Sequence, residues 1–298
     1  VQYTYYFVDG WLLQADADAT CLLGEILTRN GISGSVVEIG VYRGRYLLLL
    51  AYLLHIDEKV LAIDPILALK ATSNRVPSER ARFIQRFENR FGNSEFLEII
   101  SQGSETVSAE EIKSIVGPVR LFSVDGNHAT EFVLHDLQIA AQSLTRDGII
   151  IVDDVFNIFN PGVQTAFHRF LTSSRDVVAF LIGTNKVYLC HRNRAEFYRQ
   201  AVIDDGSLKL FAESRPFADS KVAVLATSAL SRSAGTWRVR DPSRHLAASL
   251  LGTVYLMGTG WYRGNPFGRS RNWTRLIRKT YAYRVLRFLK NRIAGGGT

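Results

Sequence analysis

Short apolar runs alternate with longer amphipathic stretches over residues 30 to 192. The apolar runs, rich in β-branched residues, lie at 36–39, 60–63, 97–100, 119–124 and 149–152. The stretches between them show helical periodicity, most clearly at 46–55, 78–91 and 130–144. Strands that alternate with helices in this way predict βαβ units and a mostly parallel sheet in an α/β fold.

The flanks of this region add three further elements. A helix is expected at 18–29, before the first strand, and another at 162–171, directly after Pro161. The segment "VVAFLIGTNKVYLCHR" then predicts two strands around a tight turn at Thr184–Asn185. The sheet is therefore expected to end in an antiparallel pair.

Composition is that of an ordinary globular protein, with 47% hydrophobic and 21% charged residues in 298. The two cysteines, Cys21 and Cys190, are too few for a disulfide framework, which indicates a reducing compartment. No signal peptide is expected. We therefore expect a cytoplasmic protein.

Charge separates an acidic body from a basic tail. Residues 231–298 hold 14 Lys and Arg against a single acid, Asp241. Such a tail predicts contact with an anionic membrane surface, which would make the protein peripheral there, or with nucleic acid. We expect an aromatic and helical cap at 1–30, a main domain at 31–226, and a basic, partly apolar extension at 227–298 that forms a surface-binding helix. Oligomeric state is left open.

Ligands of open parallel sheets bind beyond the carboxyl ends of the strands, so the residues there are candidates. The first run continues into "VVEIGVYRGRY", where Gly40 and Gly44 let the backbone approach a ligand closely. This spacing matches neither G-x-G-x-x-G nor the phosphate-binding P-loop. Asp64, in "LAIDP", can accept hydrogen bonds from a ribose diol, and the polar segment "SQGSET" can line an adenine edge.

The fourth and fifth runs end in carboxylates, Asp125 and the pair Asp153 and Asp154. If these two strands are neighbours, three like charges converge, which favours a bound cation between them. Oxygen ligands suit Mg²⁺ or a similar divalent ion. His128, three residues after Asp125, could take a proton from a metal-bound hydroxyl. Helix capping by the aspartates and a structural role for the histidine are the competing interpretations.

The motifs "VVEIGVYRGRY", "LAIDP", "VDGNH" and "GIIIVDDV", the last followed by "NPGV", together resemble class I S-adenosylmethionine-dependent methyltransferases. The resemblance covers about residues 30 to 192. It points to the metal-dependent O-methyltransferase branch that includes catechol and macrolide-sugar enzymes. It implies a doubly wound, Rossmann-like, mostly parallel sheet of seven strands, the last antiparallel, with S-adenosyl-L-methionine as cofactor.

The resemblance also implies roles for individual residues. The residues implied to bind the cofactor are Glu38, Gly40, Val41, Tyr42, Gly44, Asp64, Gly103, Ser104 and Asp125. The implied ligands of Mg²⁺ are Asp125, Asp153 and Asp154, and the implied catalytic residues are His128 and Asp125. Asp154 departs from the catechol type, which has asparagine there, and the loop at 40–46 has fewer glycines than many relatives. Nothing in the tail matches the family.

The predicted function is transfer of a methyl group to a hydroxyl of a sugar, another diol-containing small molecule or a glycan. One alternative is a nucleic-acid-directed methyltransferase that uses the basic tail, although an acidic rim would repel phosphates. Another is a membrane-associated binding protein with an inactive methyltransferase fold. A third is other metal chemistry, such as hydroxylation at an iron held by two carboxylates and a histidine.

Overall fold

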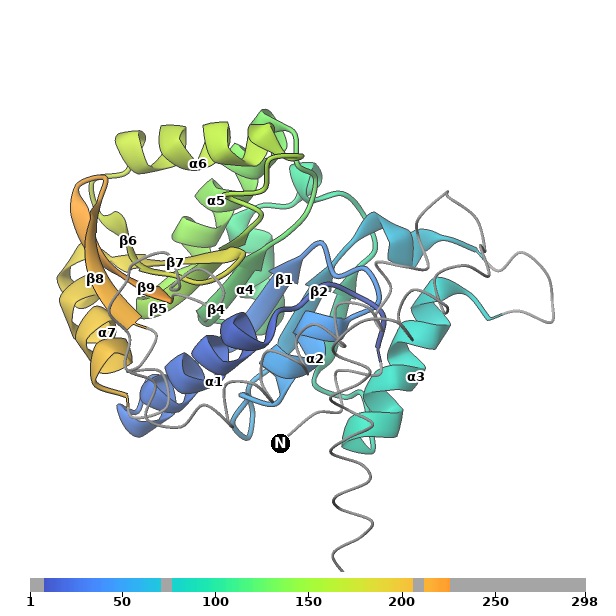
Figure 1. The fold of residues 1–298 in the computed structure, drawn as a ribbon. Helices are drawn as coiled ribbons and strands as arrows, with labels where there is room; N and C mark the ends of the chain where they lie inside the picture. Colours follow the sequence, from blue (N-terminus) through green and yellow to red (C-terminus); the bar gives the residue numbers. More distant parts are fainter. Residues whose placement is uncertain (1–7, 71–76, 206–211, 226–298) are drawn as a thin grey trace, which may run out of the picture. The chain divides into compact units, whose positions relative to one another are not determined.

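A computed structural model describes residues 8–70, 77–205 and 212–225 (Figure 1). Its strands are β1 (Ser35–Ile39), β2 (Val60–Ile63), β3 (Leu97–Ile100), β4 (Val119–Val124), β5 (Leu144–Asp153), β6 (Val177–Ile182), β7 (Lys186–His191), β8 (Ala212–Phe217) and β9 (Ser220–Leu225). Its α-helices are α1 (Gln14–Arg29), α2 (Arg45–Ala51), α3 (Glu79–Phe91), α4 (Ala109–Val116), α5 (Thr130–Ser143), α6 (Pro161–Ser173) and α7 (Arg192–Asp204). Two 3₁₀ turns, η2 (Pro65–Ala68) and η3 (Ser104–Thr106), follow β2 and β3. The predicted basic extension, with its surface-binding helix, lies outside the described residues.

All strands of the described ranges join one sheet in the order β3-β2-β1-β4-β5-β7-β6-β9-β8. Strands β1 to β5 pair in parallel with their neighbours, whereas β7 is antiparallel to both β5 and β6. The expected α/β class and doubly wound topology are therefore confirmed, including the antiparallel strand. The domain boundaries at residues 30 and 226 stay predictions.

The sheet differs from the expected seven strands by an added hairpin. β8 and β9 pair antiparallel, and β9 joins the edge strand β6 in parallel through Leu181 and Ile182. Val222 and Ala223 of β9 are fully buried, so the hairpin extends the core beyond β6. Its strands mix charged residues and a proline with apolar ones, a pattern that the periodicity over 30–192 does not contain.

Helices cover both faces of the sheet, which explains why its central strands are apolar throughout rather than alternating. One hydrophobic cluster joins the sheet to α1, α2, α3 and α7, and a second joins it to α4, α5 and α6 (Figure 1). Successive residues of a strand point to opposite clusters, as Val36 and Val37 do in β1. The sheet is thus packed on both faces, which leaves its carboxyl edge to carry the site.

Local signals explain two departures from the expected helices. α2 ends at Ala51 rather than continuing to residue 55, because Leu53 and Leu54 bond to carbonyls three residues back and tighten the last turn. α4 was not anticipated, although Ser108 caps it by accepting a hydrogen bond from the backbone N–H of Glu111. The S-x-x-E pattern of a capping box was the available signal. Within the described ranges, none of the helices has both the length and the apolar character needed to cross a bilayer.

Candidate active site

The candidate residues gather where the strand order reverses. β1 and β4 are neighbours, and the backbone N–H of Asp125 donates to the carbonyl of Ile39 at 2.9 Å. From this pair the strand order proceeds outward in both directions, and in open parallel sheets ligands bind at the carboxyl edge near such a point. Glu38 near the end of β1, Asp125 after β4 and Asp153 at the end of β5 all reach this edge.

The loop between β1 and α2 is packed against the loop that carries Asp125. Gly40 has a φ of +83°, and a Cβ at this position would lie 1.7 Å from the carbonyl oxygen of Asp125. Gly44 has a φ of +87°, and a Cβ added to Gly44 would lie 2.6 Å from the ring of Phe83. Glycine is required at both positions by backbone conformation and by space. The loop is therefore packed closely against the segment that carries Asp125.

Asp64 fixes the outer part of this loop. One carboxylate oxygen accepts from the backbone N–H of Tyr42 at 2.7 Å, and the other accepts from that of Ile66 at 2.8 Å. Tyr42 itself has a positive φ of 50°, a strained conformation for a residue with a side chain. We refer to the sequence-predicted residues at the ends of β1 and β2 and in the loop after β1 as the wall: Glu38, Gly40, Val41, Tyr42, Gly44 and Asp64. Each Asp64 oxygen keeps a further lone pair for a ligand.

Glu38 is the most deeply buried acid of this wall, with 2% of its surface exposed. Its Oε2 atom has no hydrogen-bond partner among the described residues. Burial raises the pKa of Glu38 well above its usual range; Lys186 opposes this, and Asp125, Asp153 and Asp64 add to it. A buried unpaired carboxyl oxygen is costly, so a donor from a bound ligand would stabilise the site.

Gly103 and Ser104 follow β3 and begin η3 at the same edge. Ser104 is buried, and its carbonyl accepts from Nε2 of His135 on α5 at 3.0 Å. Asp136, also on α5, is fully buried, and burial raises its pKa to about 6, with Ser104 opposing the shift. The segment after β3 is therefore held against the helix that follows Asp125.

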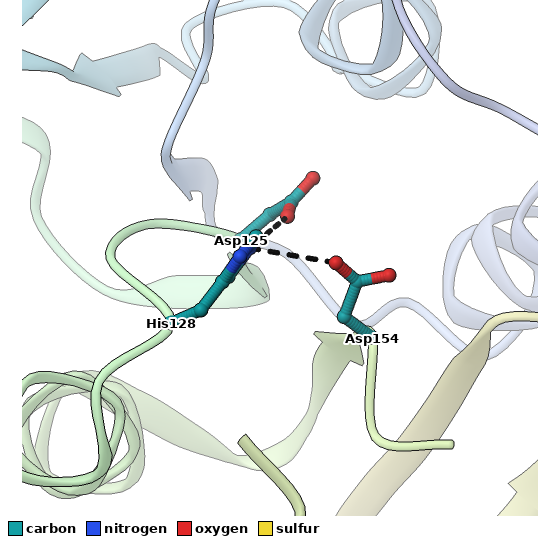
Figure 2. A group of neighbouring side chains, drawn as sticks. All are labelled: Asp125, His128 and Asp154. Carbon is teal, nitrogen blue, oxygen red and sulfur yellow. Dashed lines mark ion pairs between the residues drawn. The ribbon is translucent and has the colours of Figure 1, made fainter. Parts of the chain in front are cut away.

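Three side chains from the loops after β4 and β5 converge into one cluster, Asp125, His128 and Asp154 (Figure 2). Nε2 of His128 lies 3.8 Å from Oδ1 of Asp125 and 3.4 Å from Oδ2 of Asp154. Asp125 raises the pKa of the imidazole; burial partly opposes this, and Asp154 reinforces it. Burial and the nearby Asp153 raise the pKa of Asp125 to about 7, against the effect of His128 and Lys186.

Asp154 is held by amide groups on three sides. Its Oδ1 accepts from Nδ2 of Asn157 at 3.0 Å and of Asn185 at 2.9 Å, and its Oδ2 accepts from Nδ2 of Asn160 at 2.6 Å. Burial opposes ionisation, but these bonds hold the pKa of Asp154 below its usual value. Its φ of 60° is in the left-handed region, which is unfavourable for a residue with a side chain, and the three amide hydrogen bonds offset this cost. The position of this carboxylate is therefore set by the surrounding chain.

Asp153 adjoins this cluster through a side-chain hydrogen bond with Asp125, and it also binds groups outside the cluster. Its Oδ2 accepts from Nζ of Lys186 at 2.8 Å, and its Oδ1 accepts from Asn185 and from the backbone N–H of Asp154. Lys186 is 2% exposed and its ammonium sits over the ring of Tyr46 at 4.2 Å. Burial opposes the charge of Lys186, but the surrounding carboxylates, Asp153 first, raise its pKa. The structure thus groups Asp125, His128 and Asp154, and it places Asp153, the third predicted metal ligand, beside Asp125.

Residues 37–155 match the sequence model of a protein family described as a methyltransferase domain. The match spans 119 of the 298 residues and supports a methyltransferase domain in this part of the chain. The expected enzyme class, methyl transfer, is thereby confirmed for the region that holds every predicted site residue. The search of curated proteins found no match to this methyltransferase.

The solved structures that align with the chain include three O-methyltransferases. NovP is 18% identical and aligns over 59% of this chain and 80% of its own, with a TM-score of 0.47. CalS11, a TDP-rhamnose 3′-O-methyltransferase of calicheamicin biosynthesis, is 18% identical over 60% of this chain and 81% of its own, with a TM-score of 0.45. TomG from Streptomyces achromogenes, solved with S-adenosylmethionine, is 18% identical over 60% of this chain and 80% of its own, with a TM-score of 0.41.

The sequence analysis missed several residues that shape the methyltransferase site. These are Asp16, Asn157, Asn160, Asn185 and Lys186. Asp16, on α1, is fully buried and accepts from the backbone N–H groups of Thr184 and Asn185 at 2.9 and 3.1 Å. The two asparagines that follow Asp154 in "DDVFNIFNP" were a readable signal, because they lie within one loop of a candidate ligand. The pairing of Lys186 with Asp153 could not be predicted from the sequence, since the two residues are 33 positions apart.

Exposed apolar side chains are frequent in the segments that precede α1 or follow β1, β2 and β5. Of the eight large hydrophobic residues exposed in the described ranges, six lie in these segments: Trp11, Tyr42, Leu69, Phe156, Ile158 and Phe159. Trp11 packs on Tyr42 with ring centroids 5.6 Å apart. Ile158 and Phe159, 82% and 83% exposed, flank Asn157 and Asn160, the asparagines that bind Asp154. Clustered exposed apolar surface marks binding sites.

Proposed function

We propose that this methyltransferase transfers the methyl group of S-adenosylmethionine to a hydroxyl oxygen of a diol. The acceptor would be a sugar or another diol-bearing small molecule or glycan. The observation that carries the proposal is the direct packing of the Gly40 loop on Asp125, because it supports a cofactor held by that loop next to a cation held by the Asp125 cluster.

The residues of the wall suit the proposed cofactor. The unpartnered oxygen of buried Glu38 can accept a hydrogen bond from the amino group at the methionine end. Gly40 lets this loop pack on the backbone of Asp125, where a Cβ would clash. Asp64, with a lone pair left on each oxygen, can accept from the two ribose hydroxyls. Gly103 and Ser104 would lie at the adenine end.

The cluster at the rim suits a divalent cation. Two carboxylates and an imidazole supply the hard and borderline donors that such ions take. When bound, the sulfonium cofactor supplies an electrophilic methyl group and the cation lowers the pKa of an acceptor hydroxyl. The chain would align the hydroxyl oxygen with the methyl group, and His128 and Asp125 are the two side chains placed to take the proton.

The apolar rim favours an acceptor whose diol is attached to an apolar body. Polar groups of the cluster would hold the diol, while Ile158 and Phe159 would cover the rest of the molecule. The loop 154–161 contains no lysine or arginine, so it offers no charge to a phosphorylated acceptor. This arrangement is typical of small-molecule sites, where a few polar groups lie within apolar walls.

Calorimetric titration of S-adenosylhomocysteine tests the cofactor. We expect micromolar binding that Asp64→Ala weakens, because the carboxylate both orders the loop and would bind the ribose. Asp176→Ala, an exposed acid before β6 at the opposite edge of the sheet, is the matched control and should bind as wild type does. Absence of binding by wild type, with Mg²⁺ or with EDTA, would contradict the assignment of this cofactor.

A further inference from the structure

Asp16, in the first turn of α1, holds the two-residue turn between β6 and β7. Its Oδ1 atom accepts a hydrogen bond from the backbone N–H of Thr184 at 2.9 Å, and its Oδ2 atom accepts one from that of Asn185 at 3.1 Å. A Cβ at Gly183 would lie 1.9 Å from Oδ1 of Asp16, so glycine leaves the room that this carboxylate occupies. The backbone of the turn is therefore held by a residue 168 positions earlier in the chain.

The same turn holds two adjacent aspartates through the side chain of Asn185. Its Nδ2 atom donates to Oδ1 of Asp153 and to Oδ1 of Asp154, and its carbonyl accepts from the backbone N–H of Asp154 at 3.2 Å. Asp153 in turn shares a side-chain hydrogen bond with Asp125. All three aspartates that the sequence predicted at this rim therefore lie within two contacts of Asn185.

Buried hydroxyl groups fix α1 where it meets the turn. The Thr20 hydroxyl donates to the carbonyl of Asp16 at 2.8 Å and lies 2.8 Å from the Tyr46 hydroxyl. The Tyr188 hydroxyl donates to the same carbonyl at 3.0 Å. These bonds join α1 to α2 and to β7, so the Asp16 carboxylate is presented to the turn by a helix that is itself bonded to the core.

A charged residue at position 16 is unfavourable for stability. Asp16 is fully buried, and burial raises the pKa of its carboxyl to about 6; Lys186 opposes this shift most strongly, followed by the two N–H groups of the turn. An asparagine would avoid the buried charge, but its amino group would face one of those N–H donors, whereas a carboxylate accepts on both oxygens. An acid that costs stability and holds a loop at a candidate site is typical of residues that serve function.

From these contacts we infer that Asp16 is a positioning residue of the proposed methyl-transfer site. It holds the turn between β6 and β7, and the turn orients the carboxylates of Asp153 and Asp154 through the Asn185 amide. The inference rests on the proposed function, because Asp154 belongs to the cluster proposed to hold the cation. Asp16 and Asn185 both lie outside residues 37–155, so elements on either side of the part that matches the methyltransferase model complete the site.

A double-mutant cycle on the full chain tests whether Asp16 acts through Asn185. Calorimetric titration of Co²⁺, a probe that takes oxygen and imidazole ligands, measures the cluster without an acceptor. Asp16→Ala and Asn185→Ala should each weaken Co²⁺ binding about 10-fold, because loss of a partner behind a metal ligand typically costs 10–100-fold in affinity. The double variant should also lose only about 10-fold, since both substitutions break the same connection. Unchanged affinity in Asp16→Ala, or a loss of about 100-fold in the double variant, would overturn the inference.

Leu27→Ala separates positioning from a general loss of stability. Leu27 is fully buried on the same helix, about 16 Å from Asp16 along the helix axis. Its truncation leaves a cavity and should lower the midpoint of urea unfolding, but it should leave Co²⁺ affinity within about twofold of wild type. An equal loss of Co²⁺ affinity in Leu27→Ala and Asp16→Ala would show that Asp16 contributes only stability, and the inference would be wrong.

Asp16→Asn keeps the inference testable if Asp16→Ala does not fold. The asparagine retains one acceptor oxygen for the turn and loses the other, so Co²⁺ binding should weaken about threefold. The same affinity in Asp16→Asn and wild type would contradict a positioning role.

Binding of the cofactor product distinguishes failure of this inference from failure of the proposed function. S-adenosylhomocysteine is titrated into each protein with EDTA present, and its affinity should be the same in wild type and in every variant. Binding of S-adenosylhomocysteine by wild type without any binding of Co²⁺ would overturn the inference and leave methyl transfer standing. Absence of S-adenosylhomocysteine binding by wild type would instead contradict the proposed function.

Discussion

Replacing Gly40 by alanine tests whether the cofactor wall and the cation cluster form one packed unit. A Cβ at Gly40 would lie 1.7 Å from the carbonyl oxygen of Asp125, 2.3 Å from its carbonyl carbon and 2.7 Å from the nitrogen of Gly126. These are backbone atoms and cannot rotate away. The added methyl group therefore has to displace the segment that carries Asp125, or the loop that carries Gly40.

The expected cost has two parts that a control variant separates. A non-glycine residue in the left-handed region costs about 1–2 kcal/mol, and overpacking adds about 1–3 kcal/mol. Gly92 has nearly the same φ, +84° against +83°, but a Cβ there meets nothing within 4 Å. Gly92→Ala should therefore lower the free energy of unfolding only by the backbone cost of about 1–2 kcal/mol. Gly40→Ala should lower it by about 2–5 kcal/mol, because the overpacking cost is added.

Urea unfolding measures both variants, and titration of S-adenosylhomocysteine and Co²⁺ measures the site. We expect Gly92→Ala to bind as wild type does, because it lies at the end of α3, and Gly40→Ala to lose binding of both ligands together. If the two variants lost the same free energy of unfolding, the packing of the Gly40 loop on Asp125 would not be a constraint. Retention of both ligands by Gly40→Ala would refute the coupling of wall and cluster.

Three further outcomes are expected. Lys186→Met should cost about 3–5 kcal/mol of unfolding free energy, since it leaves a buried carboxylate unpaired, while Lys59→Met, in an exposed pair, should cost at most about 1 kcal/mol in the same urea titration. Burial raises the pKa of Asp16 from 3.8 to about 6, so the folded protein binds this proton more tightly than the unfolded chain does. The resulting stabilisation of the folded state is fully present below about pH 4 and is lost as the pH rises through 6. Wild type should therefore lose about 3 kcal/mol between pH 4 and 7 that Asp16→Asn does not, and parallel pH profiles would contradict this. Ile158→Ser should raise the KM for an acceptor with an apolar body severalfold and Ile56→Ser should not, although both side chains are highly exposed; equal effects would exclude the rim as a binding surface.

The alternation of apolar runs and amphipathic stretches was sufficient to predict strands β1 to β7 and the class of the fold. Apolar runs such as 36–39 and 119–124 became central strands because a parallel sheet covered on both faces needs apolar residues at every position. The antiparallel β6–β7 pair followed from the tight turn at Thr184–Asn185. The hairpin β8–β9 could not be found this way, since an edge hairpin with one buried strand carries polar and charged residues.

Sequence alone also located the candidate site, because a residue at the carboxyl end of a parallel strand must reach the same edge as its neighbours. Asp125 and Asp154 meet there as expected, and Gly40 approaches Asp125. The asparagines around Asp154 were within reach of the same reasoning, but their role depends on a left-handed turn that the sequence does not display.

Tertiary structure alone decided that Asp153 and Asp154 contact different charged partners. As neighbours in sequence they are equivalent candidates, but Asp153 ends β5 and pairs with Lys186 across the antiparallel strand β7. That register buries an ammonium beside one carboxylate and leaves the other at the rim with His128. A pattern along the chain records which residues reach an edge, whereas the pairing of strands distant in sequence determines which charges they meet there.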